Sequence, residues 1–161
     1  MLIHLPTLIT VALDIVAWFI IHMGVSYFMT KLPRSRFNED SSIFKQQYCE
    51  HDGSIYFRLF RINMWKRLLP DGASLFKEGF EKKKLKEFSE TYFKDFLQET
   101  CRAEITHWIV LLCSFLFFIW NLWWVGVIMV AYAIAVNIPC IITQRYNRIR
   151  LHRVLKYYQV R

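Results

Sequence analysis

Two long stretches of the chain are almost free of charge, and they alternate with stretches rich in charge. The first runs from Leu5 to Met29 and holds one carboxylate, Asp14, and one imidazole, His22. A helix needs about 20 residues to cross a hydrocarbon core. The pattern therefore predicts a transmembrane helix over residues 5–29. We expect it to be retained, because it lacks the basic start and small-residue cleavage site of a signal peptide.

The second apolar stretch, from Trp108 to Thr143, has no charged residue at all. It is too long for one crossing and suits a hairpin of two. The natural turn is Asn121, and indole rings, which favour the headgroup level, surround it. The flanking tryptophans are Trp120, Trp123 and Trp124. We predict transmembrane helices over 107–120 and 123–143.

The region between these stretches, residues 31–106, carries both charge and aromatic side chains and should be cytoplasmic or interfacial. Residues 54–69 alternate bulky apolar and basic side chains at helical spacing, which predicts one helix lying in the interface plane. Residues 70–72, Pro-Asp-Gly, predict a turn. A second helix is expected over about 76–106, running into the next span. The fold class is thus all-α, a single membrane domain over residues 1–161.

The charge distribution agrees with this topology. Of the 34 charged side chains, 27 lie between Lys31 and Glu104, and six lie in a basic tail over residues 144–161. The positive-inside rule puts both basic regions in the cytoplasm and the N-terminus outside. This topology accounts for the net charge of +8, and no nucleic-acid-binding motif is visible, so we expect no nucleic-acid partner.

The sequence predicts neither a metal site nor a cofactor. The four cysteines, which are far apart, show no C-x-x-C spacing and give no disulfide frame. The chain also has no glycine-rich phosphate loop, no G-x-S-x-G elbow and no H-E-x-x-H helix.

Ionisable groups at the membrane boundary are the candidates for chemistry. Glu104 and His107 are three residues apart, so on a helix their side chains are neighbours. A carboxylate beside an imidazole holds one tautomer and raises the basicity of the other ring nitrogen, as a general base requires. The alternative is a structural pair at the entrance of a span. Within the first span, Asp14 should be protonated or hydrogen-bonded to a neighbouring helix.

A second group of polar residues follows the last span. If helix continues beyond Pro139, then Asn137, Gln144 and Arg148 share one face, and the face ends among guanidinium groups. Such a helix end suits a phosphate-bearing partner, because arginine offers forked donors and the tail carries no acid. The alternative is a surface helix held by anionic lipid.

Short motifs along nearly the whole chain carry a family resemblance. The downstream motifs are Arg102-Ala-Glu104-Ile-Thr-His107-Trp108, Ala135-Val-Asn137-Ile-Pro139 and Gln144-Arg145-Tyr146-Asn147-Arg148-x-Arg150-Leu151. The upstream motifs are Lys31-Leu-Pro33, Ile43-Phe44-Lys45, Trp65-Lys66 and Leu69-Pro70-Asp71-Gly72. Together they resemble the glycosyl-4,4'-diaponeurosporenoate acyltransferases, small bacterial membrane proteins of the staphyloxanthin carotenoid pathway.

The resemblance implies a multi-pass protein of the bacterial cell membrane that esterifies a sugar hydroxyl of a glycosylated carotenoid, or of a related glycolipid, with a fatty acyl group. Its partners would be a lipid-borne glycosylated acceptor and an acyl-CoA or acyl carrier protein. Roles follow from residue chemistry: His107, oriented by Glu104, as base, and Asn137, Gln144 or Trp108 as donors to the oxyanion. Arg145, Arg148 and Arg150 would hold donor phosphates. Further substrate-binding candidates are Trp65, Lys66, Arg102 and Asn147. The competing hypothesis is a non-catalytic lipid-binding or scaffold protein.

Overall fold

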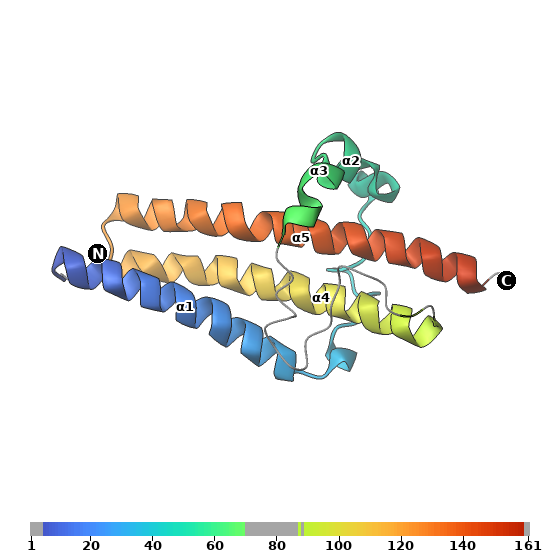
Figure 1. The fold of residues 1–161 in the computed structure, drawn as a ribbon, viewed down its shortest axis with the longest axis horizontal. Helices are drawn as coiled ribbons and strands as arrows, with labels where there is room; N and C mark the ends of the chain where they lie inside the picture. Colours follow the sequence, from blue (N-terminus) through green and yellow to red (C-terminus); the bar gives the residue numbers. More distant parts are fainter. Residues whose placement is uncertain (1–4, 70–86, 88, 160–161) are drawn as a thin grey trace.

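Three long helices make up most of the protein in a computed structural model, which describes residues 5–69, 87 and 89–159. They are α1 (Thr7–Lys31), α4 (Glu90–Cys113) and α5 (Trp123–Gln159), shown in Figure 1. All three, α4 together with the 3₁₀ turn that follows it, are long and apolar enough to cross a membrane. Throughout the described ranges every regular element is helical, so the all-α prediction is confirmed.

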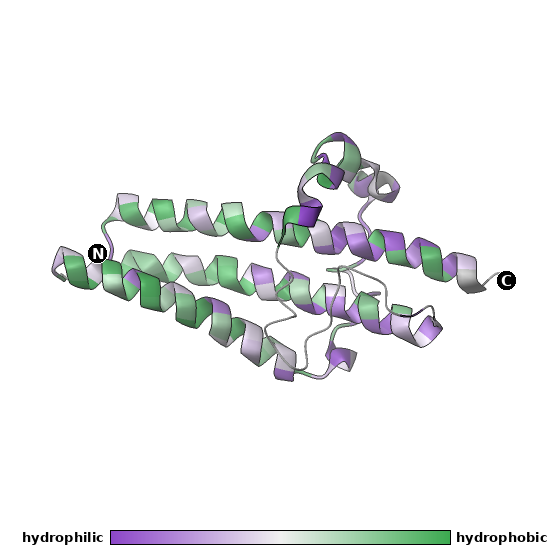
Figure 2. Cartoon of the chain, viewed as in Figure 1, coloured by the Kyte–Doolittle hydropathy of each residue, from purple (hydrophilic) through white to green (hydrophobic). Residues whose placement is uncertain are grey.

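The three helices form an elongated bundle. α1 and α5 run in the same direction and α4 runs against both, so the N-terminal end of α1 lies beside the α4–α5 connection (Figure 1). Apolar residues dominate that end, and hydrophilic residues dominate the opposite ends of α4 and α5 (Figure 2). Large side chains on α1 such as Leu8 and Phe19 are exposed, as expected for a surface that faces lipid.

The predicted hairpin turn is confirmed at Asn121. α4 tightens into the 3₁₀ helix η5 (Ser114–Ile119), and α5 starts at Trp123. The buried carboxylate of Asp14 accepts hydrogen bonds from Trp120 Nε1 at 2.8 Å and from Asn121 Nδ2 at 2.7 Å. Asp14, which we expected to be protonated or hydrogen-bonded to a neighbouring helix, is thus hydrogen-bonded to the turn, and these bonds connect α1 to it.

Close side-chain packing joins α1, η5 and α5 next to this turn. The Trp18 ring stacks on Phe117 at a centroid distance of 4.6 Å, and its Nε1 donates to Met129 Sδ at 3.3 Å. Gly126 lets the Phe118 ring approach the backbone of α5, because a Cβ there would lie 2.4 Å from Phe118 Cδ1. These close contacts therefore fix how the helices pack at the apolar end of the bundle.

The segment after α1 folds into short pieces. They are η1 (Arg34–Arg36), η2 (Tyr48–Gly53), α2 (Ser54–Arg58), α3 (Ile62–Trp65) and η3 (Lys66–Leu68). The prediction of one helix over 54–69 was wrong, because Arg61 adopts a left-handed conformation with φ of 47° and interrupts it. The Trp65 indole donates to the Phe60 carbonyl at 2.7 Å and closes this break. Tyr56 and Ile62 pack on α5.

Two further boundaries differ from expectation. α4 begins at Glu90, where Ser89 caps it by accepting from the Tyr92 amide at 3.2 Å, and Glu87 and Ser89 are not helical. The helix expected from residue 76 is therefore not continuous with α4, and its first part, like the turn expected at 70–72, lies outside the described residues. α5 continues past Pro139 to Gln159, so most of the basic tail is helical.

Candidate active site

The carboxylate of Glu104 on α4 lies at the centre of a charged network between α4 and α5. Its Oε1 accepts from Arg145 Nη1 at 2.9 Å, and its Oε2 accepts from Arg148 Nη2 at 2.5 Å. Glu104 is 1 % exposed and the Arg148 side chain 3 %. A buried carboxylate with two guanidinium partners is stable only because the charges compensate one another.

A second carboxylate, Glu50 on η2, extends this network. Its Oε1 accepts from Arg145 Nε at 2.9 Å and from the Tyr56 hydroxyl, and its Oε2 accepts from the Gln47 amide at 2.6 Å. Burial alone would raise the pKa of Glu50, but these hydrogen bonds outweigh it and hold the pKa below its usual value. Burial and the neighbouring carboxylate raise the pKa of Tyr56, which therefore remains a phenol.

One helical turn further along α4, His107 meets Asn137 of α5. The distance from His107 Nδ1 to Asn137 Oδ1 is 2.9 Å. Asn137 is fully buried, and its Nδ2 donates to the Ala133 carbonyl at 2.9 Å. Within the described residues, His107 Nδ1 thus contacts Asn137, whereas both oxygens of Glu104, the partner that we expected, accept hydrogen bonds from arginines.

Of the other predicted site residues, Gln144 and Trp108 lie on the same two helices. Gln144 Oε1 is buried, and the described residues offer it no donor. Trp108 is 41 % exposed. Arg102 belongs to a different cluster, at the end of α1, where it pairs with Glu99 at 2.7 Å and donates to the Thr30 carbonyl at 3.3 Å.

Lys66, Asn147 and Arg150 gather around the Tyr146 ring. Lys66 Nζ donates to Asn147 Oδ1 at 2.5 Å and lies 4.8 Å from the ring centroid, and the Arg150 guanidinium lies 5.8 Å from it. Burial, followed by repulsion from Arg150, lowers the pKa of Lys66 to about 8. Trp65 packs against the apolar cluster that includes Tyr146.

The three arginines expected to hold phosphates differ in what they contact. Arg145 and Arg148 share the Glu104 carboxylate, and Arg148 also donates to the Phe44 carbonyl at 3.1 Å. Arg150 is exposed. Of the three, Arg150 is thus the one that offers a solvent-facing cation.

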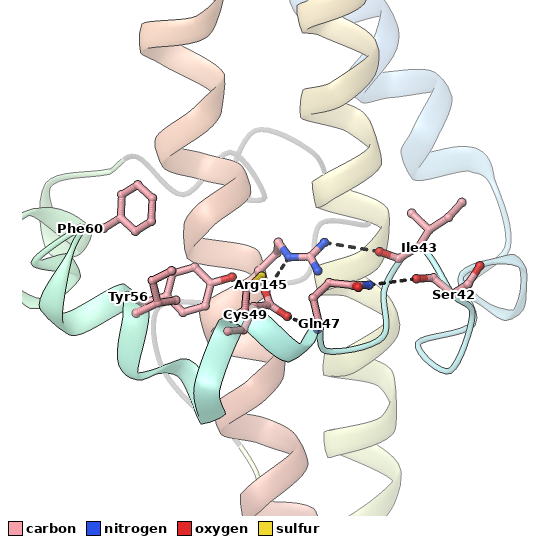
Figure 3. A pocket seen from close by; sticks show the side chains of 9 residues that line it. Ser42, Ile43, Gln47, Cys49, Tyr56, Phe60 and Arg145 are labelled. Atoms are coloured by element: carbon pink, nitrogen blue, oxygen red, sulfur yellow. Dashed lines mark hydrogen bonds and ion pairs between the residues drawn. The ribbon is translucent and has the colours of Figure 1, made fainter.

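Beside the network lies a pocket of about 420 Å³ that the sequence did not reveal. Its lining includes four polar residues, Gln47, Glu50, Tyr56 and Arg145, which we call its polar wall, and the apolar residues Ile43, Ile55 and Phe60. In Figure 3, Tyr56 and Arg145 lie between Phe60 at one end and Ile43 and Ser42 at the other. Arg145 therefore belongs both to the pocket and to the Glu104 network.

The chain is similar to known proteins over most of its length. The family model for glycosyl-4,4'-diaponeurosporenoate acyltransferase matches residues 40–157. The chain belongs to this family. No solved structure matches it.

Curated members of the family match most of the length of this acyltransferase. The glycosyl-4,4'-diaponeurosporenoate acyltransferase of Staphylococcus haemolyticus (strain JCSC1435) is 35% identical over 144 residues, which is 89% of this chain and 82% of the relative. That of Staphylococcus aureus (strain N315) is 31% identical over 139 residues, 86% of this chain and 84% of the relative.

Family membership decides between the two hypotheses that the sequence left open. The chain is an enzyme, an acyltransferase, rather than a non-catalytic scaffold. The matched segment holds every residue of the charged network, the His107–Asn137 pair and the cluster around Tyr146. Within the described residues, no three His, Cys, Asp or Glu side chains are grouped as metal ligands would be.

Proposed function

We propose that this acyltransferase moves a fatty acyl group from a thioester donor to a sugar hydroxyl of a glycosylated carotenoid or a related glycolipid. The relatives' names specify a glycosyl-4,4'-diaponeurosporenoate as the molecule that they act on. The observation that carries the proposal is the contact of 2.9 Å between His107 Nδ1 and Asn137 Oδ1, near the end of the uncharged stretch 108–143 that meets the basic part of the chain.

The orientation of Asn137 determines which nitrogen of His107 is basic. Because Asn137 Nδ2 donates to the Ala133 carbonyl, its Oδ1 is the atom that faces His107. An amide oxygen accepts only, so Nδ1 of a neutral His107 must carry the proton. The lone pair is then on Nε2, which is the form of imidazole that acts as a general base.

The reaction we propose is direct transfer. The sugar hydroxyl attacks the thioester carbonyl while His107 Nε2 takes the hydroxyl proton. The new carbon–oxygen bond forms, the carbon–sulfur bond breaks, and the imidazolium returns the proton to the departing thiolate. Gln144 and the Trp108 indole are our candidates for donors to the oxyanion, since both belong to the same two helices as the base.

The donor would be an acyl-CoA or an acylated carrier protein, and Lys66 and Arg150 are the cations we assign to its phosphates. Both lie against the Tyr146 ring, and α5 continues beyond them with further exposed basic residues. Arg145 and Arg148 instead hold the Glu104 carboxylate, so we do not assign them to the donor phosphates.

The membrane orientation we propose has the N-terminus outside and the basic C-terminal helix in the cytoplasm of a bacterial cell. Basic residues follow α1 and fill the last part of α5, whereas the tryptophan-rich turn has none. The acceptor would reach His107 sideways from the bilayer, with its sugar at the cytoplasmic surface. Cysteine accessibility to a membrane-impermeant thiol reagent in intact cells tests this orientation.

The decisive experiment is an acyl-transfer assay in proteoliposomes with glycosyl-4,4'-diaponeurosporenoate and a radiolabelled fatty acyl-CoA, the product being identified by mass spectrometry. We expect ester formation, and His107→Ala should lose about 10²-fold to 10⁴-fold in kcat, the usual contribution of a general base. The matched control is His152→Ala, an exposed histidine near the end of α5. Normal transfer by a properly inserted His107→Ala protein would refute the mechanism.

A further inference from the structure

The pocket beside Arg145 is lined by both polar and apolar residues, and this combination indicates what it binds. Its polar lining residues include Glu50, Tyr56 and Arg145. Its apolar lining residues include Ile55 and Phe60. A sugar matches such a mixed lining, because its edge carries hydroxyl groups that donate and accept hydrogen bonds and its faces carry only C–H bonds, which pack on apolar and aromatic side chains.

Charge balance at the polar wall favours a neutral ligand over a phosphate. Two carboxylates, Glu50 and Glu104, face two guanidiniums, Arg145 and Arg148, in one connected set of ion pairs. The depressed pKa of Glu50 keeps its negative charge at the wall. A phosphate would be repelled by the Glu50 carboxylate, and no excess cation is present there to offset the repulsion. An uncharged group with several hydroxyls would instead find hydrogen-bond donors and acceptors side by side.

The polar wall has hydrogen-bond donors and acceptors that the contacts within the protein do not use. Arg145 donates to Glu50, to Glu104 and, at 3.4 Å, to the Ile43 carbonyl, and a guanidinium has more N–H groups than these acceptors use. The Tyr56 oxygen donates its proton to Glu50 and retains lone pairs that accept. The wall can therefore both donate to and accept from hydroxyl groups of a ligand.

The position of the pocket agrees with a lipid-borne sugar. Arg145 is the first charged residue after the apolar part of α5, so the pocket lies where the membrane-spanning part of the helix ends. We infer that this pocket, lined by Gln47, Glu50, Tyr56, Phe60 and Arg145, binds the sugar head of the glycolipid acceptor. The inference rests on the proposed function, and it assigns the acceptor to this pocket and leaves the donor phosphates to Lys66 and Arg150.

Cys49 provides a direct test of occupancy, because it is exposed and lines the pocket. In the full-length protein carrying Cys113→Ala and Cys140→Ala, in nanodiscs of phosphatidylcholine and phosphatidylglycerol, N-ethylmaleimide alkylation of Cys49 is followed by mass spectrometry. Submicellar octyl β-D-glucoside should slow alkylation about tenfold at about ten times its Kd, by mass action. Octanol, which has the same chain and no sugar, should leave the rate unchanged. Equal effects of both, or no effect of the glucoside, overturn the inference.

A kinetic comparison uses two tyrosines. Tyr56→Phe should raise the KM for the glycosylated acceptor about tenfold and leave the KM for the acyl donor unchanged, the loss expected for one hydrogen bond to a bound ligand. Tyr48→Phe is the matched control, because Tyr48 is 94 % exposed and does not line the pocket. A rise in the donor KM instead would overturn the assignment.

The two experiments separate this inference from the proposed function. If acyl transfer depends on His107 but the glucoside does not protect Cys49, the pocket assignment is wrong and the function stands. If the glucoside protects Cys49 but no acyl ester forms with any donor, the function is wrong and the sugar pocket stands.

Discussion

Asn137 Oδ1 of α5 lies 2.9 Å from His107 Nδ1 of α4, and the Asn137 amide is itself held by the Ala133 carbonyl one turn earlier. This relationship fixes a ring tautomer through a neutral amide rather than a carboxylate. It also joins the two helices at the depth where the apolar part of the bundle begins.

The first prediction concerns Asn137 as a positioning residue. Asn137→Ala should lower kcat about 10-fold to 100-fold, the loss typical when the outer partner of a functional imidazole is removed, with KM nearly unchanged. Asn137→Asp should restore much of the rate, because a carboxylate oxygen also accepts from Nδ1. Steady-state kinetics in proteoliposomes measure both, with exposed Asn63→Ala as control. An unchanged kcat in Asn137→Ala would exclude this role.

A second prediction concerns the stability that Glu104 provides. Glu104→Gln leaves the buried Arg148 and the partly buried Arg145 with one negative charge fewer, and removing one member of a buried ion pair typically costs about 3–5 kcal/mol of folding free energy. We expect a large fall in thermal unfolding temperature in detergent. Glu90→Gln is the matched control: Glu90 pairs with Lys94 at 2.7 Å, but both side chains are largely exposed, so little change is expected. Equal shifts in the two variants would contradict the prediction.

The third prediction is a pH dependence carried by Lys66. Because its folded-state pKa is lowered to about 8 from an ordinary value of 10.5, the folded protein releases this proton first. Its contribution to folding stability is therefore lowest below pH 8 and rises between about pH 8 and 10.5. Over the same range the loss of its charge should raise the KM for a phosphate-bearing donor. Lys66→Arg should abolish this rise, because arginine stays charged, whereas exposed Lys45→Arg should not. A pH-independent donor KM in the unaltered enzyme would contradict the assignment.

The fourth prediction concerns helix packing near the hairpin turn. Gly126→Ala forces a methyl group against the Phe118 ring, where a Cβ would be 2.4 Å from Cδ1, and overpacking of this kind costs about 1–3 kcal/mol. Gly24→Ala meets nothing within 4 Å and should be neutral or slightly stabilising, since alanine favours helix. Thermal unfolding of the two variants side by side is the measurement. A Gly126→Ala protein as stable as Gly24→Ala would show that Phe118 moves aside freely.

Much of the fold followed from the sequence, because lipid imposes strong rules on composition. Apolar length predicted the long helices, and the tryptophans around Asn121 predicted the turn. The interruption at Arg61 could not be predicted in this way, because no glycine or proline accompanies its left-handed conformation. Local propensity indicated helix, and the contact of Trp65 with the Phe60 carbonyl overrides it.

Only some residues of the candidate site could be predicted from the sequence. Glu104, Asn137 and Arg148 stood out because polar groups beside an apolar run are conspicuous. Glu50 and Tyr56 did not, because no long apolar run lies beside them, and Glu50 reaches Arg145 across 95 positions of sequence. The preference for Glu104 as the partner of His107 had a related cause: sequence spacing reveals neighbours within one helix, whereas Asn137 comes from the facing helix.

The continuity of α5 has a consequence for the length of the donor. The helix runs unbroken for 37 residues, from Trp123 to Gln159, about 55 Å at 1.5 Å per residue. Asn137 and Arg150 both belong to it, and they are about 20 Å apart along its axis by the same rise. On the proposed function, α5 thus sets the distance between the acyl carbon, near Asn137, and the phosphates of its carrier, near Arg150. An extended phosphopantetheine arm, common to coenzyme A and acyl carrier protein, is of comparable length, whereas a short acyl phosphate would not reach.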